Sequence, residues 1–456
     1  MYLTPRKTSS ITRTEVRSNA LHRIVIVGGG AGGVQLATQL GDKLGKHRTA
    51  QVILVDRAAT HLWKPLLHEV AAGSMDANSH QLEYAAQARW HHFEFQQGLL
   101  SGLNRANKTI TVCAVRDEDD VEILPKREIA YHTLILSIGS ETNFFGVSGA
   151  SEHTIAIDTV AQAERFRRRM IAACMRAQNR LGTQAGRDRP HVNIVIIGAG
   201  ATGVELSAEL RSTAKVLGAY GLHRLDPQQD ISITIIEAGP RILAPLPERI
   251  AQETATLLRH LNIDILVSEK VTEVQPHAVL TASGKTLPTD LTVWAGGIQV
   301  PKILSDVGLP VNRLGQVIVS QTLQTMIDPD IFAFGDCASC PWPEKATMVP
   351  PRAQAAHQQA ALLYRSVQRR LEKKSLPVFH YQDRGSLVSL GRFETVGNLM
   401  GKLIGSTLFV EGKIARLLYV SLYRQHVMAL HGFMRMVLDM LGQWLRRKTS
   451  PRVKLH

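Results

Sequence analysis

Residues 23–33 read RIVIVGGGAGG, and residues 193–203 read NIVIIGAGATG. Each stretch begins with a short apolar run that is typical of a fully buried parallel strand, and each continues into a glycine-rich turn that opens a helix. One such unit holds one dinucleotide, because the free N–H groups and the positive end of the helix face the phosphates. The repetition therefore predicts two dinucleotides held by one chain, placed so that a hydride can pass between them.

The three glycines of each turn have different roles. The first permits the turn, the second lets a pyrophosphate approach the backbone, and the third lets the helix pack against the strand. In this order they are Gly28, Gly30 and Gly33 in the first turn, and Gly198, Gly200 and Gly203 in the second, where Thr202 is also a candidate contact. A single turn of this kind could equally be a helix cap, so the surrounding sequence matters.

Each unit also carries an acid at the end of its next apolar run. Residues 51–55 lead to Asp56 and residues 232–236 lead to Glu237, both positions from which a carboxylate accepts a hydrogen bond from a ribose hydroxyl. A carboxylate at Glu237 repels a 2′-phosphate, which favours NADH. Arg241 is the competing signal for NADPH, unless it is an ordinary surface cation.

Three further apolar runs end in glycine. Residues 133–137 lead to Gly139, residues 291–295 lead to Gly296, and residues 330–334 lead to Gly335 and Asp336. This order indicates a nucleotide unit, an inserted second unit, and a return to the first. Asp336 is then expected near the ribityl and phosphate part of a flavin, although it could also be the N-cap of the following helix.

A chain of 456 residues is longer than one that folds around a single hydrophobic core, so we expect more than one domain. We expect an α/β protein with two Rossmann-like domains, the second inserted in the first, and a C-terminal region. The expected boundaries are a disordered extension at 1–20, a first nucleotide domain at 21–150 and 310–375, a second at 151–309, and a membrane-association region at 376–456. Residues 1–20 have a transit peptide as their alternative interpretation.

The formal net charge of +14 points to an anionic partner. Residues 414–456 hold eight Lys or Arg and one acid, and apolar side chains recur there at helical spacing. Such a basic, apolar helix is typical of the lipid headgroup layer, although docking on its own domain or on a second subunit is the alternative. No apolar run reaches about 18 residues, and no nucleic-acid recognition motif is present. The apolar positions are Val427, Leu430, Met434, Val437, Leu438, Leu441, Trp444 and Leu445, and the flanking basic ones are Arg424, His431, Arg435, Arg446, Arg447 and Lys448.

Four cysteines are too few for a disulfide framework in a chain of this length, which favours a reducing compartment. Cys337 and Cys340 form a C-x-x-C pair without two further ligands at metal-site spacing, so we expect no metal. A redox pair would lie at a helix start beside the flavin and is the alternative to neutral thiols, which we favour. Beyond them, Gln354 and Gln358 lie four residues apart on one helical face among alanines. This surface could flank a planar electron acceptor, or it could serve close helix packing.

Taken together, these motifs resemble the type II NADH:quinone oxidoreductases, and the bacterial membrane-associated members most closely. The resemblance runs from about residue 22 to the C-terminus and includes HLWKPLLHEV at 61–70 and AQAAHQ at 353–358. It implies FAD on the first unit, NADH on the second, and a quinone reached from the opposite side of the flavin. The site residues that it implies are Glu205 near the nicotinamide, and Gln354 and Gln358 at the quinone. Glu205 would position NADH or relay a proton there, or it could serve helix contacts alone. Lys64 is expected to stabilise the reduced flavin if it faces the ring, and is otherwise a surface lysine beside Pro65. The resemblance further implies a peripheral protein on the cytoplasmic face of the inner (plasma) membrane, and a possible homodimer.

Three other proteins share such a fold. A disulfide reductase or a sulfide:quinone reductase requires cysteines beside the flavin, yet the stretch from Gly33 to Lys108 contains none. A binding protein of the apoptosis-inducing-factor type would use its basic surface for nucleic acid and would show salt-dependent DNA affinity without quinone reductase activity.

Overall fold

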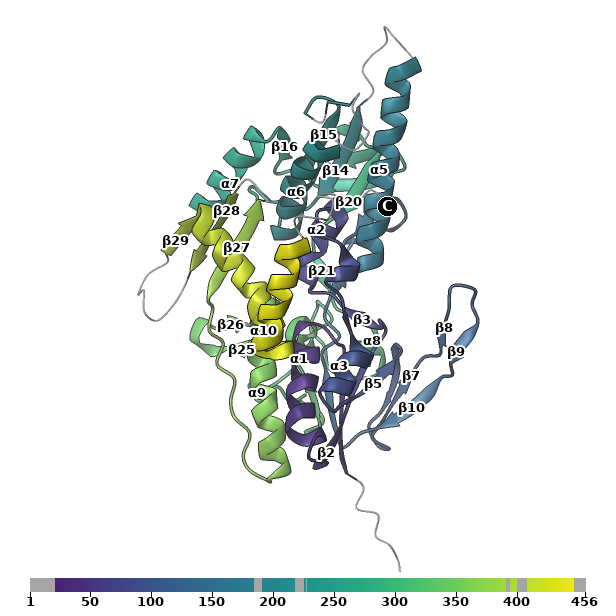
Figure 1. Cartoon of the computed structure of the whole chain (residues 1–456), viewed down its shortest axis with the longest axis vertical. Coiled ribbons are helices and arrows are strands. Elements are labelled where there is room, and N and C mark those ends of the chain that lie inside the picture. The colour runs from purple at the N-terminus through teal and green to yellow at the C-terminus, as the bar shows by residue number, and fades with distance from the viewer. Residues whose placement is uncertain are drawn as a thin grey trace, which may run out of the picture.

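Two parallel five-stranded sheets lie one above the other along the long axis of the molecule (Figure 1). The computed structural model describes residues 21–183, 191–217, 225–226, 228–390, 394–399 and 408–446. The strand order is β23-β11-β1-β2-β5 in the first sheet and β13-β20-β14-β15-β16 in the second. Both sheets have the open, helix-covered form of a dinucleotide-binding domain, which confirms the predicted fold class.

The first sheet is built around β1, whose last four residues are buried on both faces. The chain leaves this sheet after β11 and comes back to it in β23, which pairs with β11 in parallel. The first nucleotide unit is therefore discontinuous in sequence, as predicted. Its strands are β1 (His22–Val27), β2 (Ala50–Asp56), β5 (Glu94–Gln97), β11 (Thr133–Leu136) and β23 (Ile331–Ala333).

The second sheet repeats this design with β14 at its centre. The run 193–197 forms the buried part of β14, and it is followed by the second glycine turn. The strands are β13 (Ile155–Ala156), β14 (Val192–Ile197), β15 (Ile231–Ile236), β16 (Ile263–Leu266) and β20 (Leu291–Trp294).

Helices cover the faces of both sheets. In the first unit α1 (Ala31–Leu40) follows the glycine turn and packs against α9 (Ala353–Leu371). In the second unit α6 (Ala201–Leu217) follows the turn, and α2 (Leu67–Ala72) from the first unit packs against it and against α5 (Val160–Thr183). The remaining helices are α3 (Tyr84–Trp90), α4 (Ala150–His153), α7 (Glu248–His260) and α8 (Ile303–Asp306).

Small sheets of two or three strands lie between these elements; they are antiparallel except for β22 and β24, which pair in parallel. One of them carries a two-stranded hairpin that extends away from the body of the molecule (Figure 1). Their strands are β3 (Thr60–His61), β4 (Leu82–Glu83), β6 (Leu100–Asn104), β7 (Thr109–Val112), β8 (Val115–Arg116), β9 (Glu122–Leu124), β10 (Arg127–Ala130), β12 (Glu141–Thr142), β17 (Val271–Gln275), β18 (Ala278–Thr281), β19 (Thr286–Pro288), β21 (Ile298–Gln299), β22 (Val317–Ile318), β24 (Ala338–Ser339), β25 (Pro341–Trp342) and β26 (Thr347–Met348).

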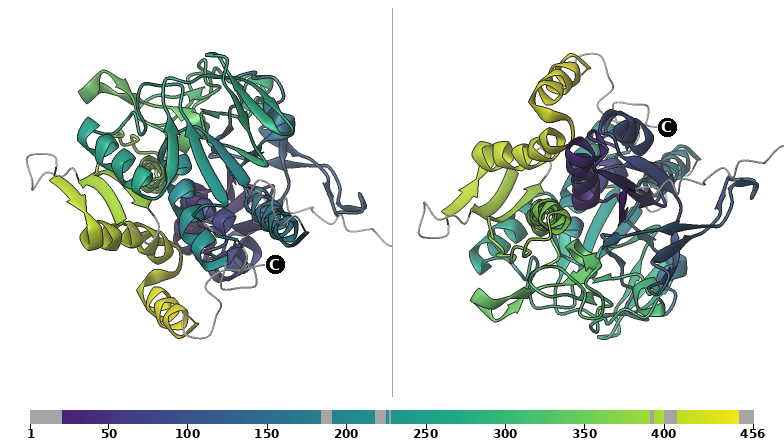
Figure 2. Two further views of the ribbon diagram at one scale, coloured as in Figure 1. Left: turned by 90° about the horizontal axis from the view of Figure 1, so that it is seen from above. Right: turned by 90° about the horizontal axis from the view of Figure 1, so that it is seen from below.

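The C-terminal region joins the two nucleotide units. It consists of β27 (Gly385–Leu390), β28 (Glu394–Leu399), β29 (Leu408–Glu411) and α10 (Gly412–Arg446). Val388 and Leu390 of β27 belong to the hydrophobic core of the second unit, whereas Leu430 of α10 belongs to the core of the first. Seen from above and below, the end of α10 stands away from the rest of the molecule (Figure 2).

The single apolar stripe expected along the C-terminal helix is wrong. The helix is interrupted at Gly432, which has φ 75° and ψ 171°. Before this break Val427 and Leu430 are buried in the protein, while after it Met434 is 70 % and Leu438 is 62 % exposed. The half of α10 before Gly432 therefore packs against the protein, and the half after it exposes apolar side chains.

The exposed half of α10 does not have the length or hydropathy of a bilayer span, and no other helix in the described ranges does. Several predictions fall outside the described residues: the extension at 1–20, the side chains of Trp444 and Arg446, and both Arg447 and Lys448.

Candidate active site

The first glycine turn has the geometry of a phosphate cradle. Gly28 has φ +102°, and a Cβ placed there would lie 2.3 Å from the Ser137 carbonyl oxygen. A Cβ on Gly33 would lie 1.9 Å from the Gly28 oxygen, so helix α1 can pack this close only without a side chain. A Cβ on Gly30 would meet no atom within 4 Å, which leaves the backbone open to a phosphate. The turn thus fits a dinucleotide pyrophosphate.

The second turn repeats this arrangement. Gly198 has φ +105°, and a Cβ there would lie 2.5 Å from the Cα of Gly296. A Cβ on Gly203 would lie 2.0 Å from the Gly198 oxygen, whereas one on Gly200 would again meet nothing. Thr202 is exposed at the start of α6. Gly296 thus lies directly under the second turn and keeps the end of β20 close to it.

The strand-end acids hold the turns through backbone hydrogen bonds. Asp56 accepts from Gly29 N at 2.6 Å and from Ala58 N at 2.8 Å. Glu237 accepts from Ala199 N and from Gly239 N, both at 2.8 Å. Burial raises the pKa of the Asp56 carboxyl, and the two N–H donors oppose that rise. Each carboxylate therefore lies beside its phosphate cradle.

Arg241, the residue that could favour a 2′-phosphate, binds its own loop. Its guanidinium donates to the carbonyl oxygens of Leu246 at 2.9 Å and Ala244 at 2.6 Å. Two of its nitrogens are therefore engaged with backbone rather than with Glu237.

A polar network joins the strand end of the first unit to the second unit. The hydroxyl of Ser140 donates to Asp336 at 2.8 Å, and Lys64 donates to the Ser140 carbonyl at 3.0 Å. The ammonium of Lys64 also lies 2.9 Å from Asp158. Burial raises the pKa of Asp158, but Lys64 and the hydrogen bonds from Thr142 outweigh it and hold that pKa below its usual value. Gly139, with φ +73° and open space around it, lies next to Ser140.

Glu205 lies where the first unit, the second unit and the C-terminal region meet. It extends from α6, is 7 % exposed, and accepts from the backbone N–H of Ser389 in β27 at 3.0 Å. Its other oxygen is 3.7 Å from Nδ1 of His68 in α2. Burial lowers the pKa of His68 to about 4, so this imidazole is neutral at physiological pH.

Gln354 and Gln358 use their amide groups within the chain. Gln354 donates to the Gly385 oxygen at 3.0 Å and to Asp383 at 3.3 Å, and it accepts from Arg384 N at 3.1 Å. Gln358 donates to the oxygen of Gln382 at 2.8 Å and accepts from its nitrogen at 3.0 Å. Both side chains thus fix the segment 382–385 against α9. We call α9 from Ala353 to Gln358, with this segment, the acceptor wall.

Three histidines that the sequence analysis does not single out lie together at this wall, and one of them, His357, belongs to it. His61 and His426 share a hydrogen bond of 2.9 Å between their Nε2 atoms. The His426 ring centroid is 5.3 Å from that of His357, which binds Gln35 in α1 at 2.5 Å. Burial lowers the pKa of His61 and of His357 to about 4, and burial with the neighbouring imidazoles lowers that of His426 well below its usual value. This histidine cluster connects α10 to α1 and α9.

Cys337 and Cys340 are free, buried thiols. Burial raises the pKa of Cys337 to about 11 and that of Cys340 to about 12, so both are protonated at neutral pH. The neutral-thiol interpretation agrees with this environment.

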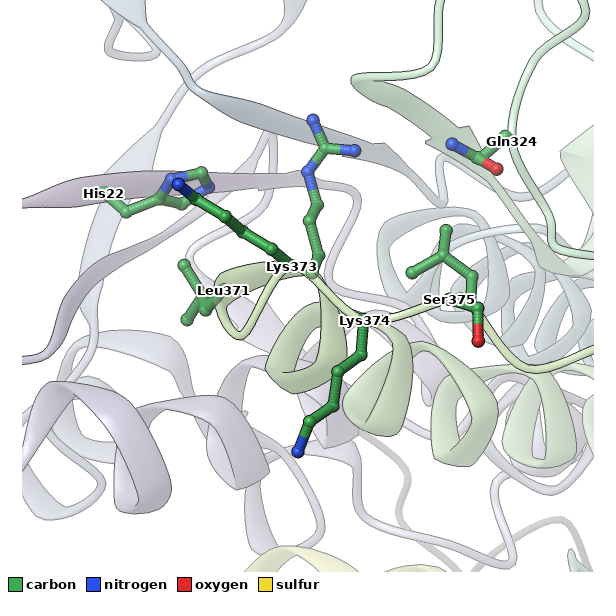
Figure 3. A pocket seen from close by; sticks show the side chains of 8 residues that line it. His22, Gln324, Leu371, Lys373, Lys374 and Ser375 are labelled. Carbon is green, nitrogen blue, oxygen red and sulfur yellow. The ribbon is translucent and has the colours of Figure 1, made fainter.

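An open hollow of about 550 Å³ lies at the opposite end of the first unit (Figure 3). His22 at the start of β1 lines it together with Arg370, Lys373 and Lys374 at the end of α9. The phosphate cradle and the acceptor wall lie at the other ends of these two elements. The hollow is therefore separate from the candidate active site.

Comparison with known proteins shows which family the chain resembles. The model of the pyridine nucleotide-disulphide oxidoreductase family matches residues 22–360. The type II NADH:quinone oxidoreductase of Haemophilus influenzae is 41 % identical over 446 residues, which cover 96 % of this chain and all of that protein. The corresponding protein of Staphylococcus aureus is 25 % identical over 390 residues, which cover 84 % of this chain and 90 % of that one.

Solved structures show the same fold. The NDH2 protein of Plasmodium falciparum, solved in complex with NADH, matches with a TM-score of 0.77 and 19 % identity over 95 % of this chain and all of that chain. The sulfide:quinone oxidoreductase of Aquifex aeolicus matches with a TM-score of 0.69 and 18 % identity over 90 % of this chain and 92 % of that chain.

Proposed function

The chain belongs to the type II NADH:quinone oxidoreductase family, and we propose a place in it for each substrate and cofactor. The enzyme transfers two electrons from NADH through a flavin to a quinone. We assign FAD to the first unit, formed by 21–150 and 310–375, and NADH to the second, formed by 151–309. The region 376–456 is assigned to membrane association.

The FAD assignment is supported by the open face of Gly30 and by the network around Asp336. Gly28, Gly30 and Gly33 shape the cradle for the pyrophosphate, and Asp56 is beside it for a ribose hydroxyl. Lys64 and Gly139 belong to the network at the reactive end, where an ammonium stabilises negative charge on the reduced cofactor. Bound FAD supplies the redox chemistry by taking a hydride from NADH and giving two electrons to the quinone.

The NADH assignment is supported by the environment of Glu237. Gly198, Gly200, Gly203 and Thr202 line the second cradle, and Gly296 supports it from below. The carboxylate of Glu237 repels a 2′-phosphate, and Arg241 is held by backbone oxygens.

We assign the electron acceptor to the acceptor wall. Gln354 and Gln358 shape this wall by fixing the segment 382–385, so their role is to frame the quinone site. Glu205 connects α6 to β27 and lies beside His68, which suits it to keep the NADH unit in register with the C-terminal region.

We propose that the exposed half of α10 lies in the headgroup layer on the cytoplasmic face of the membrane. Six exposed apolar side chains support this proposal: Phe433, Met434, Leu438, Met440, Leu441 and Leu445. The sequence around this face is basic. Each Lys or Arg near the surface of anionic lipid adds about 1 kcal/mol to the free energy of membrane binding. A homodimer that covers the same face is the second candidate, and nucleic acid is not an expected partner.

Two matched variants test the assignment of the two units. A Cβ added at Gly30 or at Gly200 meets no protein atom within 4 Å, so we expect a substitution there to affect a bound pyrophosphate before it affects folding. We expect Gly30→Val to lose FAD from the purified protein. Gly200→Val should keep its FAD and raise the KM for NADH at least about tenfold. The exchanged pattern, with FAD lost from Gly200→Val alone, would contradict the assignment.

A further inference from the structure

A tryptophan and an arginine join the exposed half of α10 to the body of the first unit. The guanidinium carbon of Arg435, three residues after the break at Gly432, lies 4.7 Å from the centroid of the Trp90 ring. Trp90 is the last residue of α3, and it is 50 % exposed. The quadrupole of an indole attracts a cation over its face. The exposed half of α10 is therefore held beside the end of α3.

Arg435 lies at the edge of the apolar face of α10 rather than in its middle. The side chains that form this face recur at spacings of three and four residues, and they are Met434, Leu438, Leu441 and Leu445. With 3.6 residues per turn, Arg435 is roughly a quarter turn away from the middle of this face. Trp90 therefore flanks the apolar face, and one flat surface can touch both.

The end of α3 is packed tightly against the turn that follows α1. This turn is η1 (Gly41–Gly45), a single turn of π-helix. A Cβ on Gly41 would lie 2.0 Å from the carbonyl oxygen of His91, and a Cβ on Gly45 would lie 2.0 Å from that of His92. The two segments can approach this closely only because both positions are glycine. The ends of α1 and α3 thus form one continuous surface.

This surface is basic. Its exposed side chains are Lys43, Lys46, Arg48, Arg89 and Trp90, which we call the basic platform. The acid between them in sequence, Asp42, lies 2.9 Å from Nδ1 of His91. Glu372, an acid near Lys43 at the end of α9, pairs with Lys374 at 2.7 Å. The basic platform therefore presents positive charge on both sides of a half-exposed indole.

The chemistry of this surface matches an anionic lipid bilayer. Tryptophan is enriched at the membrane–water interface, because its ring is apolar and its N–H is polar. Lys and Arg beside it are attracted by the headgroups of anionic lipid. A weak apolar anchor binds stably when a basic patch reinforces it. The basic platform and the apolar face of α10 together provide this combination.

We propose that the basic platform is a second membrane contact, outside the C-terminal region, which rests on the assignment of the exposed half of α10 to the membrane. Its cations bind the headgroups of anionic phospholipid, and Trp90 enters the headgroup layer beside α10. The contact between Trp90 and Arg435 then fixes how the first unit is oriented on the bilayer, because it joins the two membrane-binding elements directly.

Removing charge from the basic platform tests the headgroup contact. The measurement is co-sedimentation of the full-length, FAD-loaded enzyme with vesicles of phosphatidylcholine, with and without phosphatidylglycerol. We expect Lys43→Gln/Lys46→Gln to weaken binding to the phosphatidylglycerol vesicles at least about tenfold, and to leave binding to pure phosphatidylcholine unchanged. The matched control is Arg168→Gln/Arg169→Gln, which removes the same charge from exposed positions on α5 and should bind as the wild type does. FAD content and ferricyanide activity should be unchanged in both variants.

Brominated phospholipid measures whether Trp90 reaches the lipid. In a full-length Trp444→Phe variant the remaining tryptophans are Trp90 and three buried ones, Trp63, Trp294 and Trp342. We expect vesicles that contain brominated phosphatidylglycerol to quench part of the tryptophan emission of this variant. The quenching should disappear in Trp444→Phe/Trp90→Phe.

Three outcomes would overturn this inference while leaving α10 in the membrane. One is equal binding of the platform variant and the α5 control to phosphatidylglycerol vesicles. Another is sedimentation of Trp444→Phe without any quenching by brominated lipid. The third is a change from dimer to monomer in the platform variant, seen by light scattering, with unchanged vesicle binding. A wild-type enzyme that sediments with neither kind of vesicle would instead contradict the membrane assignment of α10 itself.

Discussion

At the residue scale, Asp56 and Glu237 can combine two tasks, because each carboxylate oxygen can accept a further hydrogen bond beside the one from the backbone. Each binds the backbone of its glycine turn, and each lies beside the cradle where a ribose is expected. The sequence predicts both acids from their place at a strand end. It does not predict their backbone hydrogen bonds, because these depend on how the turn closes in three dimensions.

Replacing Glu237 tests its role in cofactor choice. We expect Glu237→Ser, with Arg241 retained, to lower the preference for NADH over NADPH at least about tenfold, because the charge that repels a 2′-phosphate is gone. The measurement is kcat/KM for both cofactors with ferricyanide as acceptor. Glu237→Gln is the control, since its amide oxygen still accepts from the turn while the charge is absent.

Glu237→Gln should show a similar relaxation with a smaller loss of activity. An unchanged cofactor ratio in both variants would mean that the ribose 2′ position is read by other residues.

The partners of Lys64 illustrate what residue-level prediction misses. The HLWKPLLHEV motif indicates Lys64, yet no sequence signal points to Ser140 or Asp158. Asp158 lies at the entrance to the inserted unit, so its contact with Lys64 exists only when the two units are packed together. Residues that act through contacts between distant segments have no local sequence pattern from which they could be predicted.

At the scale of secondary-structure elements, the buried strands are the best-predicted parts. Short apolar runs before a glycine turn are typical of strands inside a parallel sheet, and each of them is found there. The break in α10 is not predicted, because an isolated glycine is tolerated in many helices. The break separates the part of α10 in which Val427 and Leu430 are buried from the part in which Met434 and Leu438 are exposed.

The buried histidines make the docked half of α10 sensitive to acid. The folded-state pKa of His61, His68 and His357 is about 4, below the unfolded value of 6.5. Their contribution to stability is therefore complete above pH 6.5 and is lost as the pH falls from 6.5 to 4, because the unfolded chain binds protons there and the folded chain does not. We expect the free energy of unfolding to decline steeply over this range.

Urea unfolding at pH 7.5, 6 and 5 measures this decline. His61→Gln should make it shallower, since one buried imidazole is removed at about 1.4 kcal/mol per unit of pKa shift. His260→Gln, at an exposed position on α7, is the matched control and should leave the slope unchanged. Equal stability at pH 7.5 and pH 5 would contradict the neutral histidine cluster.

At the scale of the whole molecule, the C-terminal region determines how the two units are held together. The contact of Glu205 with Ser389 and the placement of Leu390 and Leu430 in different cores bring three distant parts of the chain together. The sequence predicts a C-terminal region with basic and apolar faces. It cannot predict which residues dock and which stay exposed, because both kinds are apolar and follow the same helical spacing.

Membrane association belongs to this scale as well. We expect a chain that ends after Gly432 to lose its binding to vesicles of anionic lipid, because the exposed apolar half of α10 is removed. Its FAD content and its ferricyanide activity should be unchanged. Co-sedimentation with anionic and with zwitterionic vesicles measures the loss. Removing residues from Val427 onward should in addition destabilise the protein, since Val427 and Leu430 are buried.

The double variant Leu438→Gln/Leu441→Gln should reproduce the loss of vesicle binding in the full-length chain. If the shortened chain still sediments with the vesicles, another surface carries the membrane contact. If light scattering shows that the shortening turns a dimer into a monomer without altering vesicle binding, the exposed half is a subunit interface.

The central claim is that electrons pass from NADH on the second unit, through FAD on the first, to a quinone. Anaerobic stopped-flow spectroscopy of the purified, FAD-loaded enzyme tests it most directly. We predict that NADH bleaches the oxidised-flavin absorbance much faster than NADPH does, and that a second mix with a short-chain ubiquinone restores the absorbance within the turnover time. A protein whose flavin is not bleached by NADH, or is bleached but not reoxidised by ubiquinone, would contradict the account.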